Sequence, residues 1–118
     1  MKRTMFVGAM LASMSIGTIA QAVEHTVLIL PDAYFPRITY LNPGDTVRFI
    51  NETDATHEIV SKNGTWTLEI ATEGEEVMVI EQGVQKTFYD AESANVDDEG
   101  NEYFAVEGKM SFSPPPID

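Results

Sequence analysis

Apolar and polar residues alternate in short runs through most of the chain, and no long run repeats with the 3.6-residue period of a helix. The clearest run, Thr46 to Asn51, places Val47 and Phe49 on one side of an extended segment. The segment Asn42-Pro43-Gly44-Asp45 before it predicts a turn, because proline fixes φ and glycine accepts positive φ. Further strands are predicted at 25–30, 37–41, 57–60, 65–70, 77–81, 85–90, 102–107 and 109–113, with Gly108 as a bulge or bend between the last two. Eight or nine short strands between turns are typical of an all-β sandwich or barrel.

Residues 1–22 have the pattern of a secretory signal peptide. Lys2 and Arg3 give a positive start, an apolar stretch follows, and Ala20-Gln21-Ala22 offers a small-x-small cleavage site. Serine, threonine and glycine interrupt the apolar stretch, which is shorter than the ~20 apolar residues of a membrane span. We therefore expect removal of residues 1–22 and a single domain, 23–118, in a periplasm or outside the cell, with no membrane span.

The net charge of this domain limits the kinds of partner that it can bind. All 19 acidic residues but only five of the seven basic ones follow residue 22, so the formal net charge of that part is −14. Such a charge argues against nucleic acid and anionic membranes. It fits a soluble exported protein, or one that docks to a basic protein partner. The sequence also contains no nucleophile elbow, phosphate loop or Ser/His/Asp arrangement, so we do not expect an enzyme.

Three segments in order resemble the cupredoxin family of plastocyanin and pseudoazurin. "FPRITYLNPGDTVRFINETDATHEIV" (35–60) resembles the segment that carries the first copper ligand of the family. "GVQKTFYD" (83–90) resembles the strand that ends at its cysteine, and "VEGKMSF" (106–112) resembles its final strand. The resemblance implies a cupredoxin-like Greek-key β-sandwich of seven or eight strands. We expect its core to contain Val47, Phe49, Ile59, Leu68, Phe88 and Phe112.

The copper ligands implied by the resemblance are mostly missing. A type 1 copper site uses a cysteine thiolate and two imidazoles, usually with an axial methionine. His57 matches the first histidine, but the chain has no cysteine, and no histidine follows His57. The cysteine position falls at Tyr89 or Asp90, and the methionine position falls near Ala105 or Val106. The sequence thus predicts no type 1 site and no blue colour. It leaves two alternatives for His57: a metal ligand, or a hydrogen-bonded residue at the surface or sheet edge that binds no metal.

An acidic segment, Ala91 to Asn101, takes the place of the ligand loop. Clustered carboxylates suit a hard cation such as Ca²⁺, which makes Asp97, Asp98 and Glu99 candidate ligands. The alternative is a solvated, mobile loop that carries charge.

His25 is a second candidate for copper. If cleavage follows Ala22, the chain begins Val23-Glu24-His25, and a free amine, two amides and the imidazole can form a square plane around Cu(II) or Ni(II). The alternative is that His25 only opens the first strand. In the cupredoxin arrangement, His25 and His57 lie at opposite ends of the sandwich, so we do not expect them to share an ion.

Three functions remain open. The first is an exported, non-redox binding or interaction module that has the cupredoxin shape without a type 1 site. The second is a periplasmic protein that binds or handles copper through His25 or His57. The third, an electron-transfer protein with an altered site, has the least support because three of the four ligands are absent.

Overall fold

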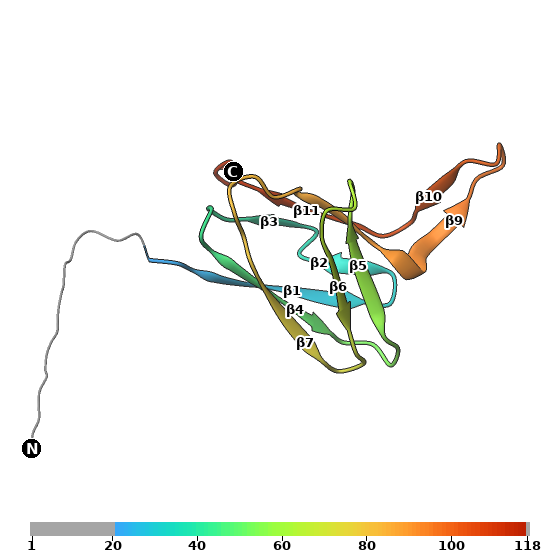
Figure 1. Cartoon of the computed structure of the whole chain (residues 1–118), viewed down its shortest axis with the longest axis horizontal. Helices are drawn as coiled ribbons and strands as arrows, with labels where there is room; N and C mark the ends of the chain where they lie inside the picture. Colours follow the sequence, from blue (N-terminus) through green and yellow to red (C-terminus); the bar gives the residue numbers. More distant parts are fainter. Residues whose placement is uncertain (1–20, 118) are drawn as a thin grey trace, which may run out of the picture.

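The computed structural model describes residues 21–117, which form a sandwich of two β-sheets with one projecting hairpin (Figure 1). The strands are β1 (Glu24–Leu30), β2 (Ala33–Phe35), β3 (Ile38–Tyr40), β4 (Thr46–Asn51), β5 (His57–Ser61), β6 (Thr67–Ile70), β7 (Glu75–Val79), β8 (Thr87–Asp90), β9 (Ala94–Val96), β10 (Glu102–Phe104) and β11 (Glu107–Ser111). One sheet has the order β2-β1-β4-β7 and the other β3-β11-β8-β5-β6, while β9 pairs with β10 in a two-stranded sheet. The predicted all-β sandwich is confirmed. The predicted signal peptide lies almost entirely outside the described residues.

Alternation of side chains along the central strands builds the core. In β4, Val47 and Phe49 are fully buried, and in β5 Ile59 is fully buried. These residues face inward because successive side chains of a strand point to opposite faces of the sheet. The same alternation turns His57, at the start of β5, toward the interior. Of the predicted core, Phe88 is also buried, whereas Leu68 and Phe112 are partly buried and pack against its edge.

Phe88 of β8 is the centre of an aromatic cluster. Its ring centroid lies 5.0 Å from that of Tyr34, 5.6 Å from that of Phe49 and 5.9 Å from that of Trp66. Gly108 lies directly opposite Phe88 in the register of β11 and β8. The prediction of a bulge or bend at Gly108 is wrong: Gly108 is inside β11 and continues its regular register with β8, and the break between β10 and β11 falls at residues 105–106.

The sheets are mixed, and the parallel pairing of β1 with β4 defines the two ends of the molecule. Glu24 pairs with Thr46 and Ile29 pairs with Asn51, so both strands start at one end and finish at the other. We call the first the Asp45 end and the second the Asn51 end. Among residues 21–117, no helix has the length and apolar character needed to cross a bilayer.

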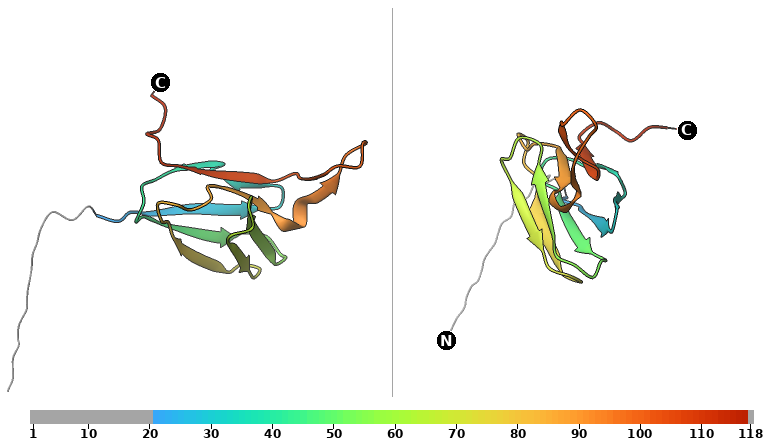
Figure 2. Two further views of the ribbon diagram at one scale, coloured as in Figure 1. Left: turned by 45° about the horizontal axis from the view of Figure 1, so that its top comes forward. Right: turned by 90° about the vertical axis from the view of Figure 1, so that its right-hand side faces the viewer.

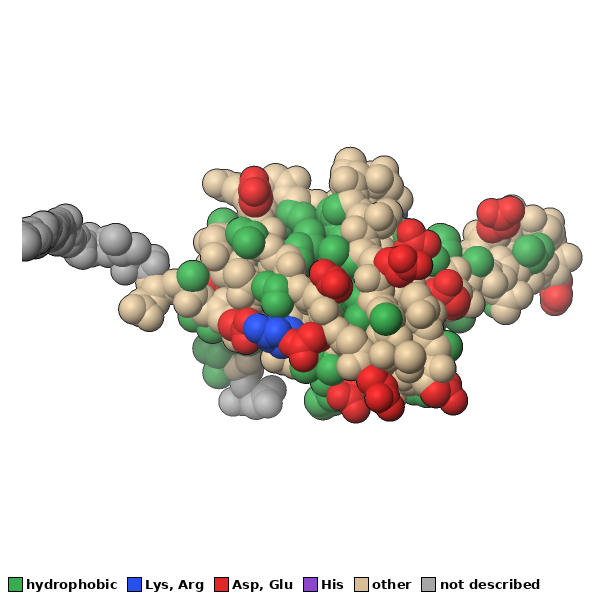
Figure 3. All heavy atoms as spheres, turned by 60° about the horizontal axis from the view of Figure 1, so that its bottom comes forward, with side chains coloured by type: hydrophobic (Ala, Val, Ile, Leu, Met, Phe, Trp, Pro, Cys, Tyr) green, Lys and Arg blue, Asp and Glu red, His purple; other side chains and the backbone are tan. Residues whose placement is uncertain are grey.

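The acidic segment at 91–101 is not an irregular loop. It begins with a single 3-10 turn, Ala91–Ser93, and continues into β9, a tight turn and β10 (Figure 2). The sequence predicted neither β9 nor β2, because each has only three residues and takes its conformation from a partner strand. Acidic side chains are scattered over the face of the sandwich drawn in Figure 3 and also lie on the projecting hairpin.

Candidate functional site

His57 and Asp90 meet inside the sandwich at the Asn51 end. His57 begins β5 and Asp90 ends β8, and these strands are neighbours in which Ile59 pairs with Asp90. The side chains of His57 and Asp90 are 10% and 2% exposed, and His57 Nδ1 lies 2.7 Å from Asp90 Oδ2. The two residues therefore form a buried imidazole–carboxylate pair.

Asn51 fixes the loop that delivers His57. Its buried side-chain amide donates hydrogen bonds to the carbonyl oxygens of Ala55 and Ile70, at 2.8 and 3.0 Å. Its side-chain oxygen accepts from Thr53 N at 2.9 Å. Ile70 is also the strand partner of His57, so a single amide ties the loop and β6 together at the site.

Asp90 also caps the turn that follows it. Its Oδ1 accepts a hydrogen bond from Glu92 N at 3.0 Å, and Ser93 Oγ donates to its carbonyl oxygen at 2.6 Å. Burial raises the pKa of Asp90 above the ordinary range, although the bonds from Glu92 N and His57 oppose this shift. Since the carboxyl uses both oxygens, the pair is held from two sides.

Glu92 turns back toward β5 and completes a cluster of three possible ligands. Its carboxylate accepts a hydrogen bond from Glu58 N at 2.9 Å. One ligand atom each from His57, Asp90 and Glu92 lies within 4.8 Å of the other two. One imidazole and two carboxylates can hold a divalent cation of borderline or hard character. The sequence could not predict that Glu92 lies close to His57, because the position of its side chain depends on the 3-10 turn Ala91–Ser93.

The donor set at the Asn51 end does not fit blue copper. Asp90, rather than Tyr89, faces His57 at the position where the cupredoxin resemblance requires the cysteine. Tyr89 points to the other face of the sheet, where its ring stacks on that of Phe104 at 4.8 Å. Val106, near the expected methionine, is buried, and its carbonyl accepts a hydrogen bond from Asp90 N. Aspartate and valine supply neither the thiolate nor the thioether of a type 1 site.

Tyr34 is a buried polar residue near this end that sequence reasoning did not single out. Its hydroxyl has no hydrogen-bond partner among the described residues. Burial raises the pKa of Tyr34, and the nearby charges of Asp90 and Glu92 raise it further.

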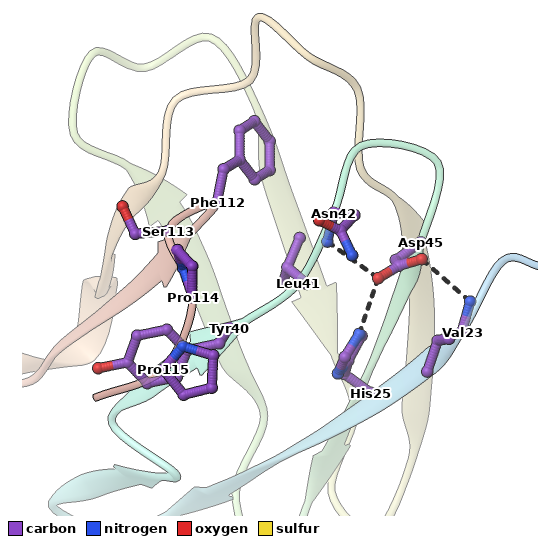
Figure 4. A pocket seen from close by; sticks show the side chains of 10 residues that line it. All are labelled: Val23, His25, Tyr40, Leu41, Asn42, Asp45, Phe112, Ser113, Pro114 and Pro115. Atoms are coloured by element: carbon purple, nitrogen blue, oxygen red, sulfur yellow. Dashed lines mark hydrogen bonds and ion pairs between the residues drawn. The ribbon is translucent and has the colours of Figure 1, made fainter. Parts of the chain in front are cut away.

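The other histidine lies at the Asp45 end (Figure 4). The carboxylate of Asp45 accepts hydrogen bonds from Asn42 N at 2.9 Å and Val23 N at 3.0 Å, and His25 Nε2 lies 3.0 Å from its Oδ2. The bonds from Asn42 N, His25 and Val23 N, in that order, hold the pKa of Asp45 below its ordinary range. A cavity of about 360 Å³ opens beside this group.

The candidate copper motif Val23-Glu24-His25 is extended along β4 in this structure. Thr46 N donates to the carbonyl oxygen of Val23, and the register continues with Glu24 opposite Thr46 and His25 opposite Val47. His25 therefore lies at the Asp45 end of the sandwich, whereas His57, at the start of β5, lies at the Asn51 end.

The acidic residues of the candidate cation site are in the tip of the hairpin. Asp97 Oδ1 accepts hydrogen bonds from Glu99 N and Asn101 N, each at 2.9 Å. Within residues 21–117, Asp97, Asp98 and Glu99 do not form a group of converging ligand atoms. The Asp97 carboxylate shapes the turn instead.

Comparison with known proteins identifies the fold. No protein-family model and no curated protein sequence matches the chain. An oxidized mutant of amicyanin superposes with a TM-score of 0.56 at 16% identity, covering 73% of this chain and 78% of that chain. The Cu(I) form of another amicyanin mutant gives 0.54 at 17% identity, covering 78% of this chain and 83% of that one. The chain therefore has the cupredoxin fold, without the cysteine of a type 1 site.

Proposed function

We propose that this cupredoxin-fold chain is exported and works as a non-redox binding module in the periplasm or outside the cell. The observation that carries the proposal is the buried pair of His57 Nδ1 and Asp90 Oδ2, 2.7 Å apart. This pair occupies the place where the resemblance requires copper bound to imidazole and thiolate. At this site the histidine pairs with an aspartate and not with a copper-bound thiolate. Without a thiolate, the site lacks the ligand on which the redox chemistry of type 1 copper depends.

Export and solubility belong to the same proposal. Residues 1–22 carry the signal pattern, and the strands found in residues 21–117 lie between Glu24 and Ser111, so cleavage after Ala22 would remove none of them. A formal net charge of −14 after residue 22 suits a soluble domain whose partner is basic.

Copper titration of the chain that starts at Val23 tests the proposal. We expect no intense thiolate-to-copper absorption with Cu(II) and no reversible copper couple in voltammetry. The variant Asp90→Cys, which restores the missing thiolate beside His57, is the positive control for detection. A strong blue colour or a reversible couple in the parent protein would contradict the non-redox proposal.

A second function, handling of a divalent cation, is favoured by the convergence of His57, Asp90 and Glu92. Calorimetric titration with Zn²⁺, Mn²⁺ and Cu²⁺ tests it. Binding at this cluster should be lost in Asp90→Asn and weakened in Glu92→Gln. The matched control is Glu69→Gln, which removes an exposed carboxylate from neighbouring β6 outside the cluster. Equal effects of all three variants would contradict a cation site here.

A further inference from the structure

The hairpin of β9 and β10 forms a two-stranded sheet of its own and exposes apolar side chains to solvent. It projects away from the sandwich (Figures 1 and 2). Val96, Tyr103 and Phe104 are 57%, 45% and 36% exposed. An isolated two-stranded hairpin is marginally stable in water, so packing against another surface would stabilise it. The exposed parts of these three side chains therefore form an apolar surface that the rest of residues 21–117 leaves open to solvent.

The hairpin is nevertheless built to hold its shape. At its tip, Asp97 accepts two backbone hydrogen bonds, and Gly100 adopts a φ of 87° that favours glycine. At its base, the ring of Phe104 stacks on Tyr89 of β8, and Ala105 N donates to the carbonyl oxygen of Ser93. A surface ordered before binding loses less conformational entropy when a partner docks.

The chemistry of the hairpin combines apolar and acidic groups. Val96 and Glu102 are cross-strand partners, so they share one face of the hairpin. Between the hairpin and the outer face of the β5–β8–β11 sheet lies a hollow of about 470 Å³, which is lined by Lys62, Tyr89, Glu102, Tyr103, Phe104 and Glu107. The lining holds two carboxylates and the cation Lys62, and Glu107 also lies 3.6 Å from Arg37. A lysine or arginine side chain of a partner would therefore pair with Glu102 and also gain from the aromatic ring faces.

We propose that the β9–β10 hairpin docks an extended basic segment of a partner protein, with Lys or Arg entering the hollow and a neighbouring apolar side chain covering Val96. This inference rests on the proposed binding function and names the surface that performs it. Charge complementarity selects the occupant, because the formal net charge after residue 22 is −14. The same charge disfavours a second copy of this chain, since two acidic hairpins repel each other.

An NMR titration tests the proposal. The ¹⁵N-labelled chain that starts at Val23 is titrated with a short acetylated peptide in which lysine and leucine alternate. We expect amide shift changes at residues 94–104 and Tyr89, and weaker binding as salt rises. A matched peptide with glutamine for lysine should bind much more weakly. Absence of binding, equal binding of the glutamine peptide, or shift changes spread over the acidic surface would overturn the proposal.

A pair of double variants separates the hairpin from acidity in general. Val96→Ser with Glu102→Gln should weaken peptide binding about tenfold. The control, Val79→Ser with Glu76→Gln, makes the same changes on β7, where Val79 is 59% exposed. It should leave binding unchanged. Equal weakening by both pairs, or dimerisation of the parent through the hairpin in sedimentation, would overturn the proposal. Peptide binding that fails while the copper titration stays colourless would reject this surface and leave the non-redox proposal standing.

Discussion

At the scale of single residues, the His57–Asp90 pair should control stability at the Asn51 end. His57→Ala removes a hydrogen bond from a carboxylate that is 2% exposed, which should lower the free energy of unfolding by about 1–3 kcal/mol at neutral pH. Burial already raises the pKa of Asp90, so its charged form is the costly one in the folded state. The deficit should therefore shrink as pH falls and Asp90 takes up a proton. Urea unfolding at neutral and mildly acidic pH measures this change, and a deficit that grows on acidification would contradict it.

Asp45 should show the opposite pH dependence. Its pKa is lowered in the folded state by backbone hydrogen bonds from Asn42 and Val23 and by His25. A lowered pKa contributes stability above the unfolded value of ~3.9, and this stability is lost as pH falls through the folded pKa. Asp45→Asn should cost about 1 kcal/mol or more at neutral pH, because an amide cannot accept all three bonds. The cost should vanish in acid, and an equal cost at both pH values in urea unfolding would argue against this account.

At the scale of elements, the contact between β11 and β8 leaves no room for a side chain at Gly108. A Cβ there would lie 2.4 Å from Phe88 Cε2 and 2.9 Å from Tyr34 Cδ2. Gly108→Ala should therefore cost about 1–3 kcal/mol through overpacking. Gly83→Ala is the control, because a Cβ at that position would meet no atom within 4 Å. Thermal unfolding should give a lower melting temperature for Gly108→Ala than for Gly83→Ala. Similar melting temperatures would show that the rings of the aromatic cluster can shift to make room for the added methyl group.

The strands that could be predicted from sequence are those in which alternating apolar and polar side chains show which face of the strand is buried. β4 and β5 alternate strongly, so both strands and their buried residues were predictable. β7 begins at Glu75, two residues before the predicted start, because its first residues pair with β4 although they are acidic and exposed. Of the hairpin at 94–104, β10 falls within the strand predicted at 102–107. β9 was missed because it is short and exposed and depends on pairing with β10.

The same distinction holds for the candidate site. Asp90 could have been chosen over Tyr89 from the two-residue period, because Phe88 is a core residue and Asp90 must share its face. Glu92 could not have been placed, since it lies beyond the strand, where the 3-10 turn breaks that period. The bonds of Asp45 to Val23 N and His25 likewise depend on the pairing of β1 with β4, which no local pattern encodes.

At the scale of the whole molecule, the two histidines occupy separate ends of the sandwich. The register runs from His25 opposite Val47 to Ile29 opposite Asn51, and a strand rises about 3.3 Å per residue. The loop held by Asn51 then leads to His57. The imidazoles are therefore more than about 10 Å apart along the strands alone. Ligands of one ion lie within roughly 4 Å of each other, because each bond is about 2 Å long.

The affinity of copper or nickel for Val23-Glu24-His25 should therefore not depend on His57. The metal ion should compete with the Asp45 carboxylate for the amine of Val23. To surround an ion, the amine and the first amides must leave the β4 ladder, and Val23 N must leave the Asp45 carboxylate. In the chain that starts at Val23, Asp45→Asn should thus bind Ni²⁺ more tightly than the parent, whereas His25→Ala or one added N-terminal residue should abolish binding. His57→Ala, the control at the other end, should leave the affinity unchanged. Calorimetry together with the absorption of square-planar Ni²⁺ measures all four variants. Loss of the same ion in both histidine variants would mean that the two ends meet, contrary to the strand register.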